Sequence, residues 1–172
     1  MNSSFIETLS KKDLVEILGK CWMTHDGMWF YNTLLENGLE SANRINKAAI
    51  RSLAPIEIQR FRKRLGIESV ESYEKLAGFF RAVSELLIPD FMNISFTFPG
   101  DNTASWEFNE RKCFAYNGIN LLGVIDAYEC GPIYRIRCWL DALGIRYTMD
   151  PDIQTCIMPS KGRCSGRISF RF

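Results

Sequence analysis

The hydrophobic period of the chain first changes at Pro89, and this change restricts the fold more than any other feature. Before Pro89, apolar residues recur at spacings of three and four, the period of an amphipathic helix. After it, "NISFTF" (residues 93–98) alternates apolar and polar side chains, which is typical of a half-buried strand. A helical first half followed by strands favours an α+β fold with an antiparallel sheet.

We therefore expect one α+β domain over residues 1–172, mainly helical over 1–90 and strand–helix–strand over 91–172. In this arrangement, an N-terminal helical layer packs on a C-terminal antiparallel sheet, and a helix pair intervenes between the strands. A chain of this length is typical of a single domain.

The first helix is predicted from its two ends. Ser10 followed by Asp13 resembles a capping box, and Gly38 suits the position just past a helix end. A second helical region, residues 39–65, contains Pro55 and is expected to break there, because the residue before a proline disfavours helical geometry.

The remaining elements are predicted from local patterns. A further helix covers residues 69–87, and a helix pair covers 118–129 and 133–144. After the strand at 93–98 and its return over 106–108, the expected strands are 111–116, 145–149, 153–158 and 166–172.

Composition excludes several classes of function. The net charge is +1, so the molecule as a whole has no strong attraction to nucleic acid or to an anionic membrane. The first residues do not form a secretory signal, and no apolar run approaches the length of a membrane span. These features predict a cytoplasmic protein. Its six cysteines are then expected to serve packing, metal ligation or nucleophilic chemistry rather than disulfides.

Two cysteines stand near the end of the chain. Seven residues lie between Cys156 and Cys164, and a hairpin of the flanking segments would set their thiols close enough to share one zinc ion. Cys130 precedes Pro132, which suits the first turn of a helix, and a helix N-terminus stabilises a thiolate. Cys113 is expected at the edge of a strand near the same end of the sheet.

The six cysteines allow two interpretations. In the first, four of them form one site, whereas in the second all six are separately buried. Cys138 is excluded from the site because eight residues of helix separate it from Cys130 by about 12 Å. Cys21 lies on the apolar stripe of the first helix and is expected to be a buried, inert thiol. The proposed ligands are Cys113, Cys130, Cys156 and Cys164.

His25 is the only histidine, so any nucleophile activated by histidine must use it. If the protein is a hydrolase, Cys130 or Cys164 would attack the substrate while His25 or Asp26 moves protons. Trp22 and Trp29 would enclose the ligand. The structural alternative is that His25 is a hydrogen-bonded core residue.

Segments of the first helical region resemble a known protein family. "HDGMWF" (residues 25–30) and "ENGLESANRIN" (36–46) resemble the D-G-x-W-F opening of an uncharacterised cytosolic family found mainly in anaerobic bacteria and archaea. The later segments "KCFAYNG", "YECGP" and "TCIMPSKGRCSGRISF" are similar to that family's second half. The pattern matches the four candidate ligands and omits Cys138.

That family is similar to the L-2-amino-thiazoline-4-carboxylic acid hydrolase-like proteins, which implies thiol-dependent hydrolysis. The C-terminal segment also resembles, more weakly, the four-vinyl reductase or hydrocarbon-binding domain, which implies an apolar ligand or a metal. The chain departs from the pattern at Ser165-Gly166, where a tryptophan is common, and at "MPSKGR" (158–163). These departures bear on the geometry of the ligands.

The leading hypothesis is a cytosolic module whose four cysteines bind zinc or an iron–sulfur centre, with a redox- or ligand-sensing role. All-sulfur ligation favours these groups over magnesium or calcium. The alternatives are a thiol-dependent hydrolase of a small cyclic amide or imine and a binding protein for a small apolar ligand. A small-molecule ligand is the expected partner, rather than nucleic acid or a membrane, and the oligomeric state is left open.

Overall fold

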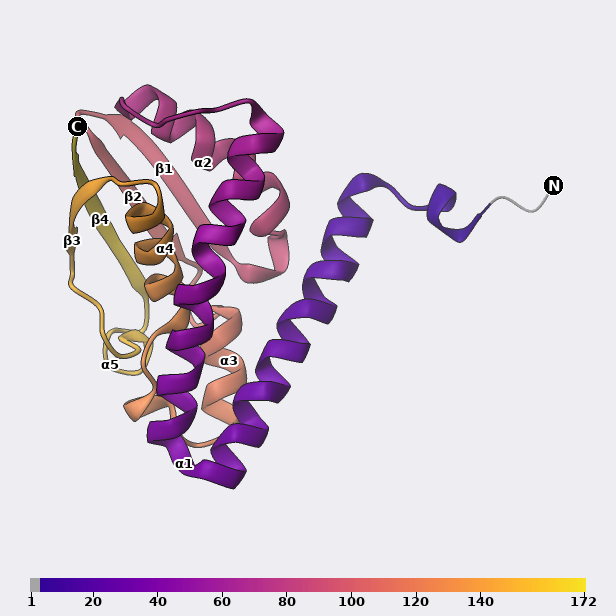
Figure 1. Cartoon of the computed structure of the whole chain (residues 1–172). Helices are drawn as coiled ribbons and strands as arrows, with labels where there is room; N and C mark the ends of the chain where they lie inside the picture. The colour runs from indigo at the N-terminus through magenta and orange to yellow at the C-terminus, as the bar shows by residue number, and fades with distance from the viewer. Residues whose placement is uncertain (1–3) are drawn as a thin grey trace.

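The computed structural model describes residues 4–172 and has the α+β fold that the change of period predicts. Helices dominate the first half and a four-stranded antiparallel sheet the second (Figure 1). The helices are α1 (Lys11–Leu65), α2 (Tyr73–Leu87), α3 (Phe114–Leu121), α4 (Gly131–Ala142) and α5 (Met158–Lys161). The strands are β1 (Ile94–Gly100), β2 (Thr103–Phe108), β3 (Arg146–Asp150) and β4 (Cys164–Arg171).

Helix α1 consists of two antiparallel halves joined at Gly38. Gly38 has φ 76° and ψ 169°, a non-helical conformation that favours glycine, so the predicted helix end is confirmed. The halves run in opposite directions as a hairpin, and we name them the arm (residues 11–37) and the inner helix (residues 39–65) (Figure 1). The capping box of Ser10 and Asp13 that begins the arm is also confirmed.

The inner helix runs through Pro55 without a break, so the expected interruption is wrong. Pro55 removes one backbone donor, which normally weakens a helix. Its neighbours Ala54 and Ile58 are buried in the main core at 0% and 3% exposure. Burial of this apolar face offsets the lost hydrogen bond, and the helix continues until Gly66 ends it with φ 65°.

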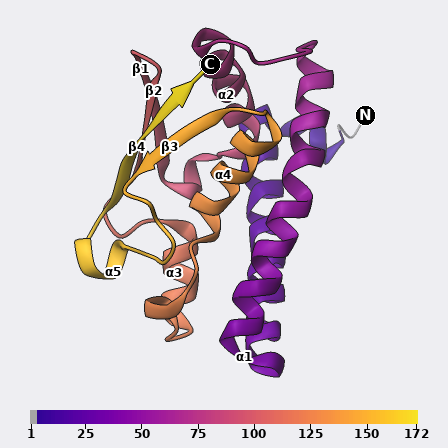
Figure 2. The same ribbon diagram turned by 60° about the vertical axis from the view of Figure 1, so that its left-hand side comes forward.

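The strand order in the sheet is β1-β2-β4-β3, and every pair is antiparallel. The inner helix, α2 and α4 cover one face of the sheet (Figure 2). Ile94, Phe96 and Phe98 point into this core while Ser95 and Thr97 are exposed, as the alternation in β1 predicts. The largest fully buried side chains include Trp106, Phe79, Phe108, Leu76 and Leu140.

Two predicted strands are wrong. Residues 111–116 contain no strand, because Cys113 instead caps α3, which begins at Phe114. Residues 153–158 form one isolated bridge, between Glu129 and Thr155, and then lead into α5. The expected hairpin of Cys156 and Cys164 is therefore absent, because β2 and β3 occupy both edges of β4.

The predicted helix pair is correct in number but shifted in its first member. That helix begins and ends earlier than expected, as α3, and a short 3-10 turn follows at Ile125–Ala127. The second member is α4, with Pro132 in its first turn. Ile133 and Leu140 on this helix are fully buried at 0% exposure.

Candidate thiol cluster and adjoining cavity

The four candidate cysteines come from four different segments of the second half. Cys113 caps the N-terminus of α3, and Cys130 caps α4. Cys156 lies in the segment before α5, and Cys164 begins β4 opposite Phe108. All four belong to, or pack against, the main hydrophobic core.

Backbone hydrogen bonds bring two of these segments side by side. The N–H of Cys130 donates to the carbonyl of Gln154 at 2.9 Å, and the N–H of Cys156 donates to the carbonyl of Tyr128 at 3.2 Å. This pairing, rather than a hairpin with β4, fixes Cys156 near Cys130. Because the pairing is non-local, no pattern in the sequence predicts it.

The thiols are near enough to influence one another's ionisation. Burial, with a smaller contribution from the neighbouring Cys164 and Cys156, raises the pKa of Cys113 to about 12. Burial also raises the pKa of Cys130 far above its ordinary value, with additional contributions from Cys113, Cys164 and Cys156. Cys138 is outside this set, and its neighbours are instead Tyr134 and Asp141.

Nearby N–H groups oppose the rise in pKa at each of the four thiols. Backbone N–H groups of Tyr116 and Ala115 act on Cys113, that of Ile133 on Cys130, and that of Met158 on Cys156. At Cys164, where burial raises the pKa to about 11, the indole of Trp106 has this role. We call Cys113, Cys130, Cys156 and Cys164 the thiol cluster.

The thiol cluster is not arranged as a closed coordination shell. Within residues 4–172, no three His, Cys, Asp or Glu side chains are placed so that they could hold one metal ion. The donor set nevertheless has the chemistry of a soft-metal site, because it is all sulfur, it is buried at Cys113 and Cys164 and partly buried at Cys130 and Cys156, and N–H donors lie beside it.

The pKa of Cys130 bears on its expected role as a nucleophile. A helix N-terminus alone would lower the pKa of a thiol, but here burial outweighs that effect and raises it. The proton therefore stays on Cys130 near neutral pH. The thiolate that a hydrolase needs is scarce in this environment.

A cavity of about 530 Å³ lies beside the thiol cluster, between the arm, the inner helix, α3 and the start of α4. Phe114 and Ala115, which come directly after Cys113 in the chain, line this cavity. Gly131 and Pro132, which come directly after Cys130, line it too. Its lining is mainly apolar, with a few polar groups. The polar side chains in the wall are Thr24, Asp26, Tyr31, Asn46, Tyr128 and Arg135.

Of the four residues expected to form a pocket on the first helix, only Asp26 lines the cavity. His25 is exposed and accepts a hydrogen bond from Trp29 Nε1 at 3.2 Å, so its assignment as a core histidine is wrong. Trp29 is 66% exposed. The indole of Trp22 contacts the guanidinium of Arg135, with 4.5 Å between Cζ and the ring centroid.

Asp26 is the carboxylate of the cavity wall. It forms no salt bridge among the residues that the structure describes. Burial raises its pKa above the ordinary value, and the positive charge of Arg135 partly opposes this rise. Arg135 is itself engaged elsewhere, because it pairs with Glu57.

Glu57 is a buried acid that the sequence analysis missed. It is 6% exposed, pairs with Arg135 and accepts a hydrogen bond from Trp139 Nε1 at 2.8 Å. This network joins the inner helix to α4 and holds Arg135 at the cavity. A single acid on the apolar side of an otherwise amphipathic helix is the signal that could have found it.

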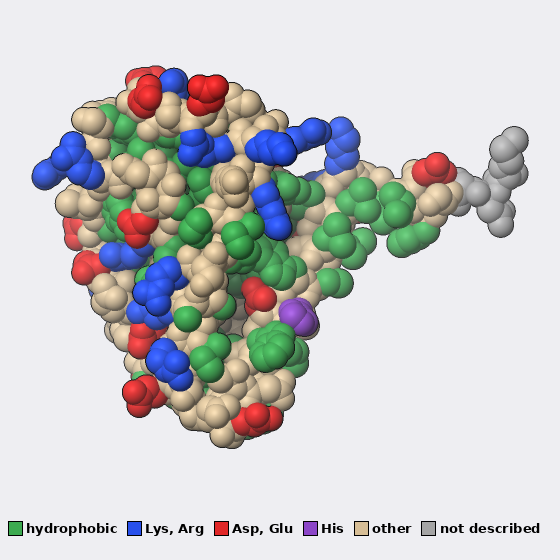
Figure 3. Space-filling view, viewed as in Figure 1, with side chains coloured by type: hydrophobic (Ala, Val, Ile, Leu, Met, Phe, Trp, Pro, Cys, Tyr) green, Lys and Arg blue, Asp and Glu red, His purple; other side chains and the backbone are tan. Residues whose placement is uncertain are grey.

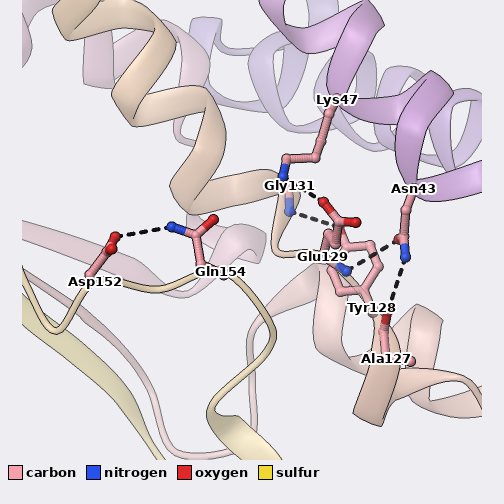
Figure 4. A network of polar contacts seen from close by, with 8 residues as sticks. All are labelled: Asn43, Lys47, Ala127, Tyr128, Glu129, Gly131, Asp152 and Gln154. Atoms are coloured by element: carbon pink, nitrogen blue, oxygen red, sulfur yellow. Dashed lines mark hydrogen bonds and ion pairs between the residues drawn. The ribbon is translucent and has the colours of Figure 1, made fainter. Parts of the chain in front are cut away.

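A polar network holds the loop that carries Cys130 (Figure 4). Asn43 Nδ2 donates to the carbonyl of Ala127 at 2.9 Å, and its Oδ1 accepts from the N–H of Glu129 at 3.2 Å. The N–H of Gly131 donates to Tyr128 Oη at 3.1 Å. A Cβ at Gly131 would lie 2.8 Å from that oxygen, so the close approach requires glycine.

Comparison with known proteins places the chain in a family through its first half. Residues 7–94 match the model of a family described as "Family of unknown function (DUF6125)". The chain belongs to the DUF6125 family. The matched region of this DUF6125 protein contains the α1 hairpin and α2, and with them the arm side of the cavity, whereas the thiol cluster lies outside it. No curated protein and no solved structure matches the chain.

No helix among the described residues is both long enough and apolar enough to cross a membrane. All six cysteines of the DUF6125 protein are free thiols, including Cys21, which is exposed rather than buried as expected. The difference arises because the stripe that carries Cys21 faces away from the protein's own core.

Proposed function

We propose that this DUF6125 protein is a metal-binding module in which Cys113, Cys130, Cys156 and Cys164 hold zinc or an iron–sulfur centre. The observation that supports the proposal is that four thiols from four separate segments lie near enough to raise one another's pKa, with an N–H donor beside each of them. Metal binding would replace the four thiol protons, since a coordinated sulfur is a thiolate.

The buried N–H groups support this chemistry because a thiolate accepts hydrogen bonds better than a neutral thiol does. Trp106 Nε1 is buried and has no hydrogen-bond partner among the described residues. A thiol is only a weak acceptor, so the neutral Cys164 leaves this donor unsatisfied. A metal-bound Cys164 thiolate would satisfy it, and such hydrogen bonds from outside the coordination sphere tune the affinity of metal sites.

The position of the thiol cluster suits a sensing role. Residues that directly follow Cys113 and Cys130 line the cavity, so a ligand there would press on the two helix N-termini that hold these thiols. Oxidation or loss of the metal would in turn release those helices. The reducing conditions that such free thiols need support a cytoplasmic location.

Metal analysis of anaerobically purified protein tests the proposal. We expect stoichiometric zinc, or iron and sulfide with visible absorption, and we expect the four clustered thiols to react with a thiol reagent only after chelation. Cys113→Ser should lose the metal, while Cys138→Ser, the matched control, should keep it. The proposal is overturned if the metal content is near zero and the clustered thiols react before any chelator is added. Both measurements use the wild-type protein, so this outcome does not depend on whether a variant folds.

The cavity favours a second candidate function, the binding of a small ligand with an apolar body. Because Asp26 is a carboxylate without a salt bridge in an apolar wall, we propose that this ligand carries a basic nitrogen. Hexylamine should therefore raise the melting temperature more than hexanoate or hexanol, and Asp26→Asn should abolish the difference. Equal shifts for the three probes, or none, contradict this candidate.

Thiol-dependent hydrolysis has less support, although the resemblance to L-2-amino-thiazoline-4-carboxylic acid hydrolase-like proteins suggests it. Cys130 would need a base, but His25 is exposed on the arm and bonded to Trp29. A catalytic Cys130 should be alkylated by iodoacetamide rapidly near neutral pH. Slow alkylation that does not change when metal is removed excludes this role.

A further inference from the structure

The arm has an apolar stripe whose side chains are mostly exposed, although one member, Met28, also borders the cavity. Its members alternate at spacings of four and three over three heptads, and the apolar ones are substantially exposed, with Leu18 at 67%, Met28 at 53% and Leu35 at 63%. Hydrophobic side chains follow the projecting part of the arm (Figure 3). The stripe consists of Leu14, Leu18, Cys21, His25, Met28, Asn32 and Leu35.

The other side of the arm is already covered by the protein itself. A Cβ at Gly19 would lie 3.1 Å from a side-chain atom of Pro89 and 3.2 Å from one of Phe91, and Phe30 is buried beside Tyr128. The arm therefore has apolar residues on two opposite sides. A surface helix of a monomer normally needs only one such side, so the outward stripe calls for a partner.

We propose that the stripe pairs with the same stripe of a second copy of this chain, in an antiparallel coiled coil about a two-fold axis. A 4-3 spacing over three heptads is the sequence pattern of coiled coils. The arm is 27 residues long by its range of 11–37, or about 40 Å, which is ample for two helices to pack along their length.

The charges at the two ends of the stripe decide the orientation. Lys11 and Glu36 lie on the same side of the helix, because 25 residues at 100° each return within about 20° of the starting direction. Parallel arms would place each charge next to its equal. Antiparallel arms place Lys11 of each copy near Glu36 of the other, which favours that orientation.

The antiparallel register also brings suitable side chains into layers. Pairing residues whose numbers add to 46 sets Leu18 against Met28 of the second copy and Cys21 against its His25. Asn32 then faces Leu14 of the second copy at the outer layer. The two polar residues of the stripe, His25 and Asn32, lower stability but fix the register, as in other coiled coils.

Sedimentation or light scattering of the full chain tests the pairing. We expect a dimer at micromolar concentration. Leu18→Glu should shift it to a monomer with unchanged helical circular dichroism. Leu121→Glu, at a leucine outside the stripe that is even more exposed (87%), should leave the dimer intact. A wild-type monomer, or a dimer that Leu18→Glu does not weaken, overturns the proposal.

Two further variants test the orientation. Lys11→Glu and Glu36→Lys should each weaken the dimer, and the double variant should restore it. After oxidation, His25→Cys should give a covalent dimer through Cys21 of the other copy. Loss of dimer in the double variant, or efficient wild-type cross-linking of Cys21 to Cys21, contradicts the antiparallel register. None of these results depends on metal in the thiol cluster, so the two proposals stand or fall separately.

Discussion

The buried indole N–H of Trp106 faces the thiol of Cys164, and it finds no hydrogen-bond partner among residues 4–172. Trp106 is 1% exposed and pairs with Gly166 across the β2–β4 ladder. A buried N–H donor without a partner costs free energy while the sulfur is a neutral thiol. The same donor stabilises the sulfur when it carries a negative charge.

The Trp106 donor leads to a prediction on metal affinity. Trp106→Phe should lower zinc affinity about tenfold, the lower end of the effect of such outer hydrogen bonds. Competition with a chromophoric chelator measures the change. Trp139→Phe is the control, because its indole bonds Glu57 rather than a thiol. It should reduce stability while the affinity stays near that of the wild type; an equal loss of affinity in both variants contradicts the prediction.

The Glu57–Arg135 pair should be a large contributor to stability. Glu57→Ala leaves Arg135 with 18% of its side chain exposed and no counter-charge, which typically costs about 3 kcal/mol. Chemical denaturation measures the loss. Asp152→Asn, which breaks the more exposed pair with Arg137, should cost less than about 1 kcal/mol. Similar losses in the free energy of unfolding for the two variants would show that burial of the Glu57–Arg135 pair does not determine its contribution.

Gly131 should tolerate no side chain. Gly131→Ala places its Cβ 2.8 Å from Tyr128 Oη and 3.1 Å from Asn46 Nδ2, which should cost about 1–3 kcal/mol. The same change at Gly78, a helical position with no atom near the added Cβ, should stabilise the protein by about 0.5–1 kcal/mol. A neutral Gly131→Ala variant would mean that Tyr128 moves aside without loss.

Asp26 and Asp13 should respond to pH in opposite directions. The folded-state pKa of Asp26 is raised, so its contribution to stability is present below its unfolded pKa and is lost as the pH rises through the folded value. Asp26→Asn should therefore stabilise the protein at pH 7, with a gain that disappears in acid. Thermal melts between about pH 3 and pH 7, an interval in which carboxyl groups titrate, measure this difference.

Asp13 provides the matched opposite case. Hydrogen bonding from Ser10 lowers its folded-state pKa, so its contribution is present above the unfolded pKa and is lost as the pH falls. Asp13→Asn should destabilise the protein at pH 7 and converge with the wild type in acid. If the melting temperatures of both variants shift in the same direction at pH 7, then either burial does not raise the pKa of Asp26 or hydrogen bonding does not lower that of Asp13.

Local patterns predicted the elements that local chemistry determines. Gly38 ends the arm because its positive φ is a property of that residue, and β1 alternates because its own side chains do. Pro55 shows the limit, since buried neighbours outweighed its local preference. The same limit explains Cys156, whose place depends on a backbone pairing with Tyr128 that no nearby residue specifies.

The arm shows a different limit. The spacing of Leu18, Cys21 and His25 correctly indicates an amphipathic helix, but a spacing carries no information about what covers the apolar side. We expected the protein's own core there, and the structure instead leaves these residues exposed. Asp26, one residue from His25, borders the cavity because adjacent residues on a helix point about 100° apart.

The place of β4 has a consequence for how the chain is made. It is the last of the four strands in the sequence, yet it lies between β2 and β3 in the sheet. During synthesis β1 and β2 can pair early, whereas β3 has no neighbour until β4 leaves the ribosome. Cys164 arrives with that strand, so the nascent chain carries three of the four clustered thiols without the fourth. Until translation reaches β4, these three thiols lack the strand that carries the fourth.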